Sequence, residues 1–279
     1  MSINKCVFPS AGFGTRFLPV TKVVPKELLP VGTSPLIEFS FNEAHDSNIS
    51  EMLVIINKDK LLIRDYFNKN FTLDTYLFNH NKSHLLDRPN NLINSCKINY
   101  VEQKVMSGLG SAILLTQEIV KEEPFAVILP DDLCFSEDES VLAQMCKIHE
   151  KYPDKTIIAI EEVDDSRVSN YGIVSGRPFL NQSDIILVDK MVEKPTDKTE
   201  IDSNLAVIGR YILNNDIFEA ISSSNMDKSG ELQLTSGLLK LANQGKVLAY
   251  KFKGTRIDCG QFEGYLYANN FFQKINKQL

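Results

Sequence analysis

Residues 5–30, KCVFPSAGFGTRFLPVTKVVPKELLP, join a short apolar run to a long irregular segment. KCVF is typical of a buried strand, whereas residues 9–30 contain two close glycines, four prolines, an arginine and two lysines. Glycines permit tight turns and prolines remove backbone donors, so neither a regular helix nor a regular strand fits this segment. The stretch therefore predicts a strand followed by a glycine-rich, basic loop.

The glycines of this loop, in GFGTR at 12–16, do not complete either of two common phosphate-binding motifs. Phe17 stands where the dinucleotide fingerprint needs its third glycine, and the G-K-[ST] of a P-loop is absent. Glycines still let backbone amides approach an anion closely. Arg16 can bind two phosphate oxygens as a fork, and Lys26 can meet another. On these residues alone, an anion site and a basic surface loop remain equally open.

Short apolar runs alternate with helical patterns over the first 163 residues. We expect strands at 5–8, 51–57, 96–103, 125–132 and 155–163, and helices at 35–48, 110–120 and 139–152, with a segment at 59–88 that is helical and then less regular. Such alternation is typical of right-handed crossovers over a mostly parallel sheet with both faces covered. Closely spaced strand patterns follow at 170–179, 185–195 and 204–213, then helices at 215–224 and 231–244, a strand at 246–260 and a helix from Gln261.

We therefore predict an α/β fold, with a Rossmann-like, mixed and mostly parallel sheet flanked by helices and a smaller lobe on the same sheet. No low-complexity linker separates the halves, so we expect one domain over residues 1–279. In such sheets ligands bind beyond the carboxyl ends of the strands. The loop at 9–30 follows one strand and Asp131 and Asp132 follow another, so they belong at the same edge. Neighbours on an extended strand face opposite ways, so Asp132 is expected to point away from the ligand.

Composition narrows the classes of function. A net charge of −6 argues against nucleic acid or an anionic membrane as the main partner, but permits a local basic site. The five cysteines are scattered without a C-x-x-C pair, which is typical of reduced thiols in a cytosolic protein. No signal-peptide pattern is seen, and no run approaches the roughly 18 apolar residues that span a membrane. We expect a cytoplasmic protein.

The longer string GFGTRFLPVTKVVPKELLP at 12–30 resembles the signature loop of the sugar-phosphate nucleotidylyltransferases. It is most similar to that of the bacterial UTP–glucose-1-phosphate uridylyltransferases, G-x-G-T-R-x-L-P-x-T-K-x-x-P-K-E-[ML]-L-P, and meets every fixed position. Further similar blocks follow in the family's order at 102–112, 125–133, 170–174, 192–195, 203–213, 230–235 and 258–265. The resemblance thus spans essentially the whole chain.

This resemblance implies a reaction of UTP with glucose 1-phosphate that gives UDP-glucose and pyrophosphate, with Mg²⁺ as cofactor. The sugar phosphate is already an anionic nucleophile, so the enzyme needs chiefly to align two polyanions and neutralise charge at the α-phosphate. Residues 1–164 are expected to serve mainly the nucleotide, and residues 165–279 mainly the sugar. The resemblance also suggests a homodimer or a dimer of dimers.

Two alternatives remain open. One is a thymidylyl- or cytidylyltransferase on the same sugar phosphate, against which the T-K-x-x-P-K-E spacing and the long helical insert at 59–95 argue. The other is a non-catalytic paralogue that binds nucleotide sugars. Such a paralogue would be expected to lose Lys26, Asp131, Asp258 or Lys194, and all four are present.

On the nucleotide side, the resemblance implies a loop whose backbone wraps the phosphates, at Ala11, Gly12, Gly14 and Thr15. Arg16 and Lys26 would bind the triphosphate and ease the departure of pyrophosphate. Gln103 would read the uracil edge, and Gly108 would let the base lie close to the backbone. On its chemistry alone, Gln103 would be read as a solvated polar side chain.

On the sugar side, the resemblance implies that Lys194 holds the sugar phosphate and that Glu193 accepts hydrogen bonds from glucose hydroxyls. Further sugar contacts are expected at Gly172 and Val207. Asp131 and Asp258 would hold Mg²⁺, which prefers one or two carboxylates plus phosphate oxygens. Taken singly, Glu193 and Lys194 could form an exposed ion pair, and each aspartate could cap a turn or a helix.

Overall fold

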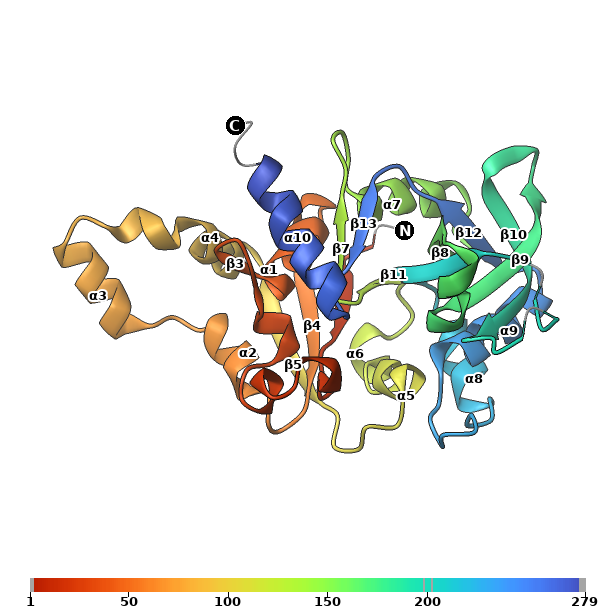
Figure 1. The fold of residues 1–279 in the computed structure, drawn as a ribbon, viewed down its shortest axis with the longest axis horizontal. Helices are drawn as coiled ribbons and strands as arrows, with labels where there is room; N and C mark the ends of the chain where they lie inside the picture. Colours follow the sequence, from red (N-terminus) through yellow and green to blue (C-terminus); the bar gives the residue numbers. More distant parts are fainter. Residues whose placement is uncertain (1–2, 198, 202, 276–279) are drawn as a thin grey trace.

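A central β-sheet organises the computed structural model, which describes residues 3–197, 199–201 and 203–275 (Figure 1). Over these residues the sheet has nine strands in the order β5-β4-β1-β6-β11-β8-β12-β10-β9. Their bounds are β1 Lys5–Pro9, β4 Glu51–Ile56, β5 Lys97–Glu102, β6 Phe125–Ile128, β8 Thr156–Glu162, β9 Gly172–Phe179, β10 Gln182–Glu193, β11 Leu205–Leu213 and β12 Val247–Lys251. One sheet therefore contains strands from both halves of the sequence.

The direction of the strands divides the sheet. β5, β4, β1 and β6 run parallel to one another, as do β8 and β12. β11 is antiparallel to β6 and β8, and β10 is antiparallel to β12 and β9. The predicted α/β fold with a mixed sheet is confirmed, and its parallel part comes mainly from the alternating first half. The closely spaced strands β9 and β10 pair antiparallel because a short connection returns the chain beside itself.

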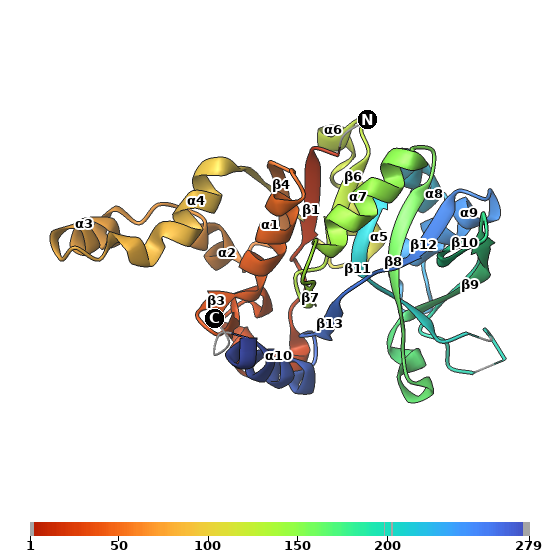
Figure 2. The ribbon, with the colours of Figure 1, turned by 90° about the horizontal axis from the view of Figure 1, so that it is seen from above.

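Helices cover both faces of the sheet (Figure 2). Successive residues of β4 point to opposite faces, so Leu53 and Ile55 pack in one apolar cluster and Met52 and Val54 in another. The first cluster is completed by α5 Leu109–Leu114, α6 Gln117–Val120, α8 Asp216–Ser222 and α9 Leu234–Asn243. The second is completed by α1 Leu36–Asp46, α2 Leu61–Tyr66, α4 Asp87–Ser95 and α7 Val141–Lys151. Burial on both faces explains the continuous apolar runs in the strands.

The helical insert forms an arm that projects from the body of the molecule (Figures 1 and 2). The arm contains α3 (Phe71–Asn79) and the 3-10 turn η4 (Ser83–Leu86) and returns through α4, whereas α2 packs on the body through Ile63 (Figure 1). Phe71 and Phe78 on α3 are 76% and 74% exposed. The arm therefore presents large apolar side chains to its surroundings.

The prediction of a single strand at 246–260 is wrong, because the chain forms two strands there. β12 joins the main sheet, whereas β13 (Thr255–Asp258) pairs antiparallel with β7 (Asp132–Phe135) in a separate sheet. Between them Gly254 has φ +147°, and a Cβ there would come within 2.5 Å of the Phe135 carbonyl oxygen. The bend places Asp258 opposite Asp132.

Two other predicted elements are interrupted. The apolar run at 125–132 ends as a strand at Ile128, and Asp132 already belongs to β7. The helix expected at 110–120 is divided into α5 and α6, and between them Thr116 Oγ1 donates to the Ile113 carbonyl at 2.7 Å. Such a side-chain bond competes with the regular helical pattern.

The loop at 9–30 is held in place by the C-terminal helix α10 (Phe262–Ile275). The loop and its continuation contain the 3-10 turns η1 Thr15–Phe17, η2 Val20–Lys22 and η3 Lys26–Leu28 and the short strands β2 Pro30–Val31 and β3 Ser34–Pro35. Tyr265 Oη donates to the Pro30 carbonyl at 2.7 Å, and the Gly32 amide donates to Asn269 Oδ1 at 3.1 Å. Neither α10 nor any other helix in the described part of the chain is long and apolar enough to cross a membrane.

Candidate active site

The glycine-rich part of the loop exposes its backbone. Asn57 Nδ2 donates to the Ala11 carbonyl at 2.5 Å, and Thr21 Oγ1 donates to the Gly14 carbonyl at 2.8 Å. Gly14 has φ +65°, which favours glycine, and no heavy atom lies within 4 Å of the place a Cβ would take at Gly12. The loop is thus anchored at both sides of an open segment, as an anion-binding backbone requires.

Two cations of the loop contact segments that are distant in sequence. Arg16, exposed in η1 next to Thr15, lies with Nη1 3.4 Å from the Gly260 carbonyl. Lys26 Nζ forms an ion pair with Asp131 Oδ2 at 2.6 Å. Burial alone would lower the pKa of Lys26, but the Asp131 and Glu27 carboxylates raise it above its usual value. Burial would raise the pKa of Asp131, but Lys26 holds it below its usual value, so both groups are charged.

A second, fully buried ion pair lies beneath this one. Lys60 Nζ, just after β4, meets Glu27 Oε2 at 2.6 Å. The Lys60 amide also donates to the Asn57 carbonyl at 3.1 Å. The segment after β4 therefore holds Glu27 in η3, and with it the neighbouring Lys26.

The two aspartates predicted as metal ligands meet at Gly260. A Cβ added there would lie 2.8 Å from Asp131 Oδ2 and 3.1 Å from Asp258 Oδ1. The Cys259 amide donates to the Asp131 carbonyl at 2.8 Å, which ties the two segments together. Among the described residues, no group of three or more His, Cys, Asp or Glu side chains forms a metal site. Two carboxylates fit a hard divalent cation whose remaining ligands are phosphate oxygens and waters.

Asp132 has its own hydrogen-bond partners, and it lines the same cavity as Asp131 and Asp258. Its Oδ2 accepts from the Gly209 amide at 2.8 Å, and its Oδ1 accepts from Arg256 Nε at 2.8 Å. Arg256 also pairs with Glu161 Oε1 at 2.7 Å. Asp132 therefore braces β7 against β11, β13 and β8.

A cavity of ≈340 Å³ lies at this edge of the sheet. It is lined by most of the residues predicted for the metal, the sugar and catalysis, namely Arg16, Asp131, Gly172, Glu193, Lys194, Val207 and Asp258. Lys26 reaches it through its ion pair with Asp131. The residues predicted for the nucleotide are all described and lie outside this lining: Ala11, Gly12, Gly14, Thr15, Gln103 and Gly108.

Glu193 and Lys194 lie side by side at the end of β10. Lys194 Nζ is 3.4 Å from Glu193 Oε1, and the Lys194 amide donates to the Tyr171 carbonyl at 3.0 Å. Lys194 has φ +45°, a strained conformation for a residue with a side chain, and such strain concentrates at functional sites. A Cβ at Gly172 would come within 3.2 Å of Glu193 Oε2, so this glycine lets the carboxylate lie against the backbone.

Gln103 and Gly108, the two residues predicted to contact the base, lie close to each other. Gln103 is buried at the end of β5, and its Nε2 donates to the Gly108 carbonyl at 3.4 Å. Gly108 has φ +98°, and a Cβ there would come within 2.6 Å of the Leu232 carbonyl oxygen. The fold itself therefore requires glycine at position 108, whether or not a base lies close to the backbone there.

The residues that sequence reasoning missed are the partners of the predicted ones. Arg256 and Tyr171 surround Asp258, and Lys60 pairs with Glu27. A signal for Arg256 is present in RIDCG, because residues two apart on a strand share a face and Asp258 follows at that spacing. The spacing in sequence gives no such signal for Lys60.

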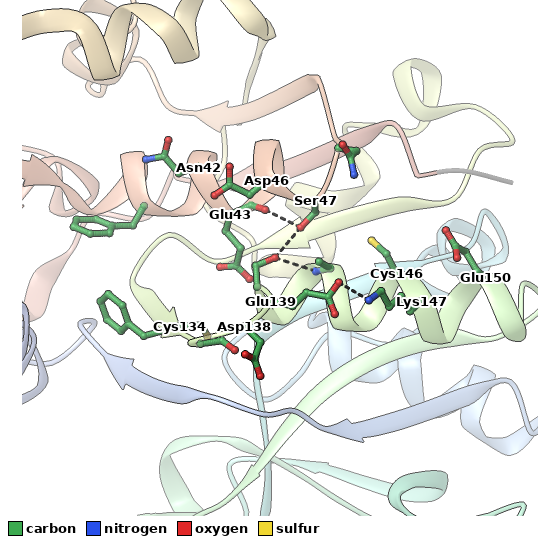
Figure 3. Close-up of a pocket in the computed structure, with 16 residues that line it drawn as sticks. Asn42, Glu43, Asp46, Ser47, Cys134, Asp138, Glu139, Cys146, Lys147 and Glu150 are labelled. Carbon is green, nitrogen blue, oxygen red and sulfur yellow. Dashed lines mark hydrogen bonds and ion pairs between the residues drawn. The ribbon is translucent and has the colours of Figure 1, made fainter. Parts of the chain in front are cut away.

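A second cavity, of ≈580 Å³, lies between α1, α7 and the segment after β7 (Figure 3). Lys147 there is paired with Glu139 at 2.7 Å. The carboxylates that line this cavity are those of Glu43, Asp46, Asp138, Glu139 and Glu150. The first cavity is lined by the cations Arg16, Lys194 and Arg256, so it offers more positive charge to a phosphorylated substrate than this one does.

Comparison with known proteins places this arrangement in a family. The chain matches the family model described as nucleotidyl transferase over residues 6–275. It is 45% identical to a UTP–glucose-1-phosphate uridylyltransferase of Pseudomonas aeruginosa, over 96% of this chain and 95% of that protein. A solved UDP-glucose pyrophosphorylase complexed with UDP-glucose is similar with a TM-score of 0.89 and 44% identity, over 98% of this chain and 99% of that one. A UTP-bound UGPase from Acinetobacter baumannii is similar with a TM-score of 0.88 and 34% identity, over 97% and 93%. The chain therefore belongs to the nucleotidyl transferase family and, within it, to the bacterial UTP–glucose-1-phosphate uridylyltransferases.

Proposed function

We propose that this chain transfers the uridylyl group of UTP to glucose 1-phosphate, forming UDP-glucose and releasing pyrophosphate. The observation that carries the proposal is the cavity on which Arg16, Asp131, Lys194 and Asp258 converge from distant parts of the chain. Cations for two phosphate groups and carboxylates for a metal are what transfer between two polyanions requires. The names of the relatives support the same substrates.

The nucleophile is an oxygen of the glucose 1-phosphate group. It forms a bond to the α-phosphorus of UTP, the bond from that phosphorus to the α–β bridging oxygen breaks, and pyrophosphate leaves with the electron pair. Arg16 and Lys26 hold the triphosphate and offset the charge that grows on the departing oxygens. Lys194 holds the sugar phosphate in line with that bond, so no side-chain nucleophile is needed.

Asp131 and Asp258 would hold a divalent cation, which we assign as Mg²⁺. Both carboxylates border Gly260, and oxygen donors of this kind suit that ion. When bound, the ion supplies positive charge to the phosphates. Lys26 contacts Asp131 directly, so phosphate binding at Lys26 and cation binding at Asp131 are expected to be coupled.

The remaining assignments divide into nucleotide residues, which lie outside the lining of the cavity, and sugar residues, which belong to it. The backbone at Ala11, Gly12, Gly14 and Thr15 binds the nucleotide phosphates. Gln103 and Gly108 bind the uracil. Glu193 accepts hydrogen bonds from the glucose hydroxyls, with backbone contacts from Gly172 and Val207. Selection of UTP over dTTP and CTP is therefore assigned to the segment around Gln103.

We further infer one domain over residues 1–279, in which residues 1–164 bind mainly the nucleotide and residues 165–279 mainly the sugar. Assembly as a homodimer or a dimer of dimers is supported by the exposed apolar side chains of the arm, such as Phe71 and Phe78. A cytoplasmic location is supported by the five cysteines, all of which are free thiols.

A grid of nucleotides and sugar phosphates tests the proposed reaction. The purified chain is mixed with Mg²⁺, with UTP, dTTP or CTP, and with glucose 1-phosphate or galactose 1-phosphate, and pyrophosphate is measured. We expect release with UTP and glucose 1-phosphate, and loss of most of that rate in Asp131→Ala. Equal turnover of dTTP would favour the thymidylyltransferase alternative. If no nucleotide gives pyrophosphate release, the result would favour the alternative of a non-catalytic paralogue.

A further inference from the structure

Tyr171 connects the carboxylate side of the cavity with its sugar side. Its phenol Oη donates to Asp258 Oδ2 at 2.9 Å, and its backbone carbonyl accepts from the Lys194 amide at 3.0 Å. The residue is buried between η5 (Asp165–Asn170) and Gly172, and it lines the cavity. One residue therefore contacts both the carboxylate expected to hold a cation and the lysine expected to hold the sugar phosphate.

The direction of the phenol hydrogen bond follows from a second partner. Arg167 Nη2 lies 2.5 Å from Tyr171 Oη, and a guanidinium can only donate. The phenol oxygen therefore accepts from Arg167 and donates its own proton to Asp258. This bond is shorter than the other two contacts of Asp258 Oδ2, with Gln261 Nε2 at 3.3 Å and Arg256 Nη2 at 3.7 Å, so it contributes most to the orientation of the carboxylate.

Arg256 holds the ring of Tyr171 from another direction. Its guanidinium carbon lies 4.8 Å from the centroid of that ring, within the range of a cation–π contact. Arg256 is itself held by ion pairs to Asp132 at 2.6 Å and Glu161 at 2.7 Å, and its side chain is only 4% exposed. The ring thus packs against a charged group that β7, β8 and β13 keep in place.

The two oxygens of Asp258 face different neighbours. Oδ2 meets Tyr171, whereas Oδ1 accepts from the Gly260 amide at 3.0 Å and lies on the same side of Gly260 as Asp131 Oδ2. A bond that holds Oδ2 therefore points Oδ1 toward Asp131, where the two carboxylates can share one cation.

We propose that Tyr171 is a positioning residue. Its hydroxyl orients Asp258 for the divalent cation, and its backbone carbonyl holds Lys194 at a fixed place relative to that cation. The inference rests on the proposed function, because it names how the chain aligns the two phosphate groups of that reaction. Partners that orient a metal-binding carboxylate typically contribute about 10–100-fold to metal affinity or activity.

A purely structural role predicts a different outcome. Tyr171 also belongs to a small apolar cluster with Val163 and Ile173, so its removal could simply loosen the start of β9. Tyr171→Phe keeps the ring, its packing and the backbone bond to Lys194, and removes only the hydroxyl. A structural role would lower the melting temperature without a specific effect on the cation.

The test compares wild type, Tyr171→Phe and a matched control. Binding of Mn²⁺ in the presence of UTP is measured by electron paramagnetic resonance, and the Mg²⁺ concentration for half-maximal pyrophosphate release is measured in parallel. In Tyr171→Phe we expect Mn²⁺ affinity to fall by about 10-fold or more, with the required Mg²⁺ concentration rising to match. The KM for glucose 1-phosphate is expected to stay within about twofold, because the bond to Lys194 is retained.

Tyr250→Phe is the control, because it also removes one phenol hydrogen bond, to Gln144 Oε1 at 3.1 Å, at a place outside the cavity. Its Mn²⁺ affinity is expected to equal that of wild type. Arg167→Met keeps the Tyr171 phenol but removes the donor that directs the phenol proton toward Asp258. We therefore expect Arg167→Met to weaken Mn²⁺ binding as well.

Unchanged Mn²⁺ affinity in Tyr171→Phe would overturn the inference, and so would an equal loss in Tyr250→Phe. The proposed function fails in a distinguishable way, by absence of pyrophosphate release from the wild type. The Mn²⁺ comparison still tests Tyr171 in that case, because it does not depend on turnover.

Discussion

The buried ion pair of Glu27 and Lys60 allows a quantitative test of how the loop at 9–30 is anchored. Lys60 Nζ lies 2.6 Å from Glu27 Oε2, and the two side chains are 6% and 0% exposed. At an effective dielectric constant of about 20, unit charges at that separation attract by about 6 kcal/mol. Burial raises the pKa of Glu27 and lowers that of Lys60, so desolvation opposes much of this attraction. The intact pair therefore contributes little net stability, but either charge alone is strongly destabilising.

We expect Lys60→Met to lower the free energy of unfolding by about 3–5 kcal/mol, because it leaves the Glu27 carboxylate buried without its partner. Within the described residues Glu27 Oε1 has no hydrogen-bond partner, and the neighbouring cation Lys26 is already paired with Asp131. The double variant Glu27→Met/Lys60→Met removes both charges and is expected to lose much less, with a coupling energy above about 2 kcal/mol.

Unfolding in guanidinium chloride, followed by far-UV circular dichroism, measures these free energies. Tyrosine fluorescence serves as the second probe, because the chain has no tryptophan. The control Lys97→Met breaks an exposed pair with Glu51, whose atoms are 3.3 Å apart on side chains 67% and 30% exposed, and is expected to cost less than about 1 kcal/mol. Additive losses in the double variant would refute the reasoning, and so would a Lys60→Met cost as small as that of the control.

Two further changes test the site and the core. Gly260→Ala would place a methyl group 2.8 Å from Asp131 Oδ2 and 3.1 Å from Asp258 Oδ1, so we expect pyrophosphate release to slow by about 100-fold with little change in melting temperature. A normal rate would show that the two carboxylates do not act together. Burial lowers the pKa of His149, whose Nε2 lies 3.0 Å from Asn214 Oδ1, so the unfolded chain binds more protons and stability is lost as pH falls below about 6.5. His149→Gln is expected to flatten the pH dependence of the free energy of unfolding between about pH 5 and 7, and an unchanged slope would rule out His149 as its source.

The strands and the loop could be predicted because their signals are local. A run such as FAVIL at 125–129 is apolar on both faces, which indicates a central strand whatever its neighbours are. The meeting of Lys26 and Asp131 follows from the shared direction of β1 and β6, since the carboxyl ends of parallel strands lie at one edge.

The contacts between distant segments could not be predicted in this way. Lys60 is one charge among several in NKDK, and nothing nearby in the sequence indicates Glu27, 33 residues earlier, as its partner. The break near Gly254 depends on the Phe135 carbonyl, which a different strand supplies. Tyr171 and Arg256 meet only because β9 and β13 are brought together by the folded sheets. Each of these is a product of tertiary packing and leaves no periodic pattern in the chain.

The central claim is that the α-phosphorus of UTP passes to the sugar phosphate, and it is tested most directly by following that atom. The chain is incubated with Mg²⁺, glucose 1-phosphate and UTP that carries radioactive phosphorus at either the α or the γ position, and the products are separated. We predict that the α label appears in UDP-glucose and the γ label in pyrophosphate. Transfer of the γ label to a sugar product, or recovery of the α label in UMP without UDP-glucose, would contradict the account.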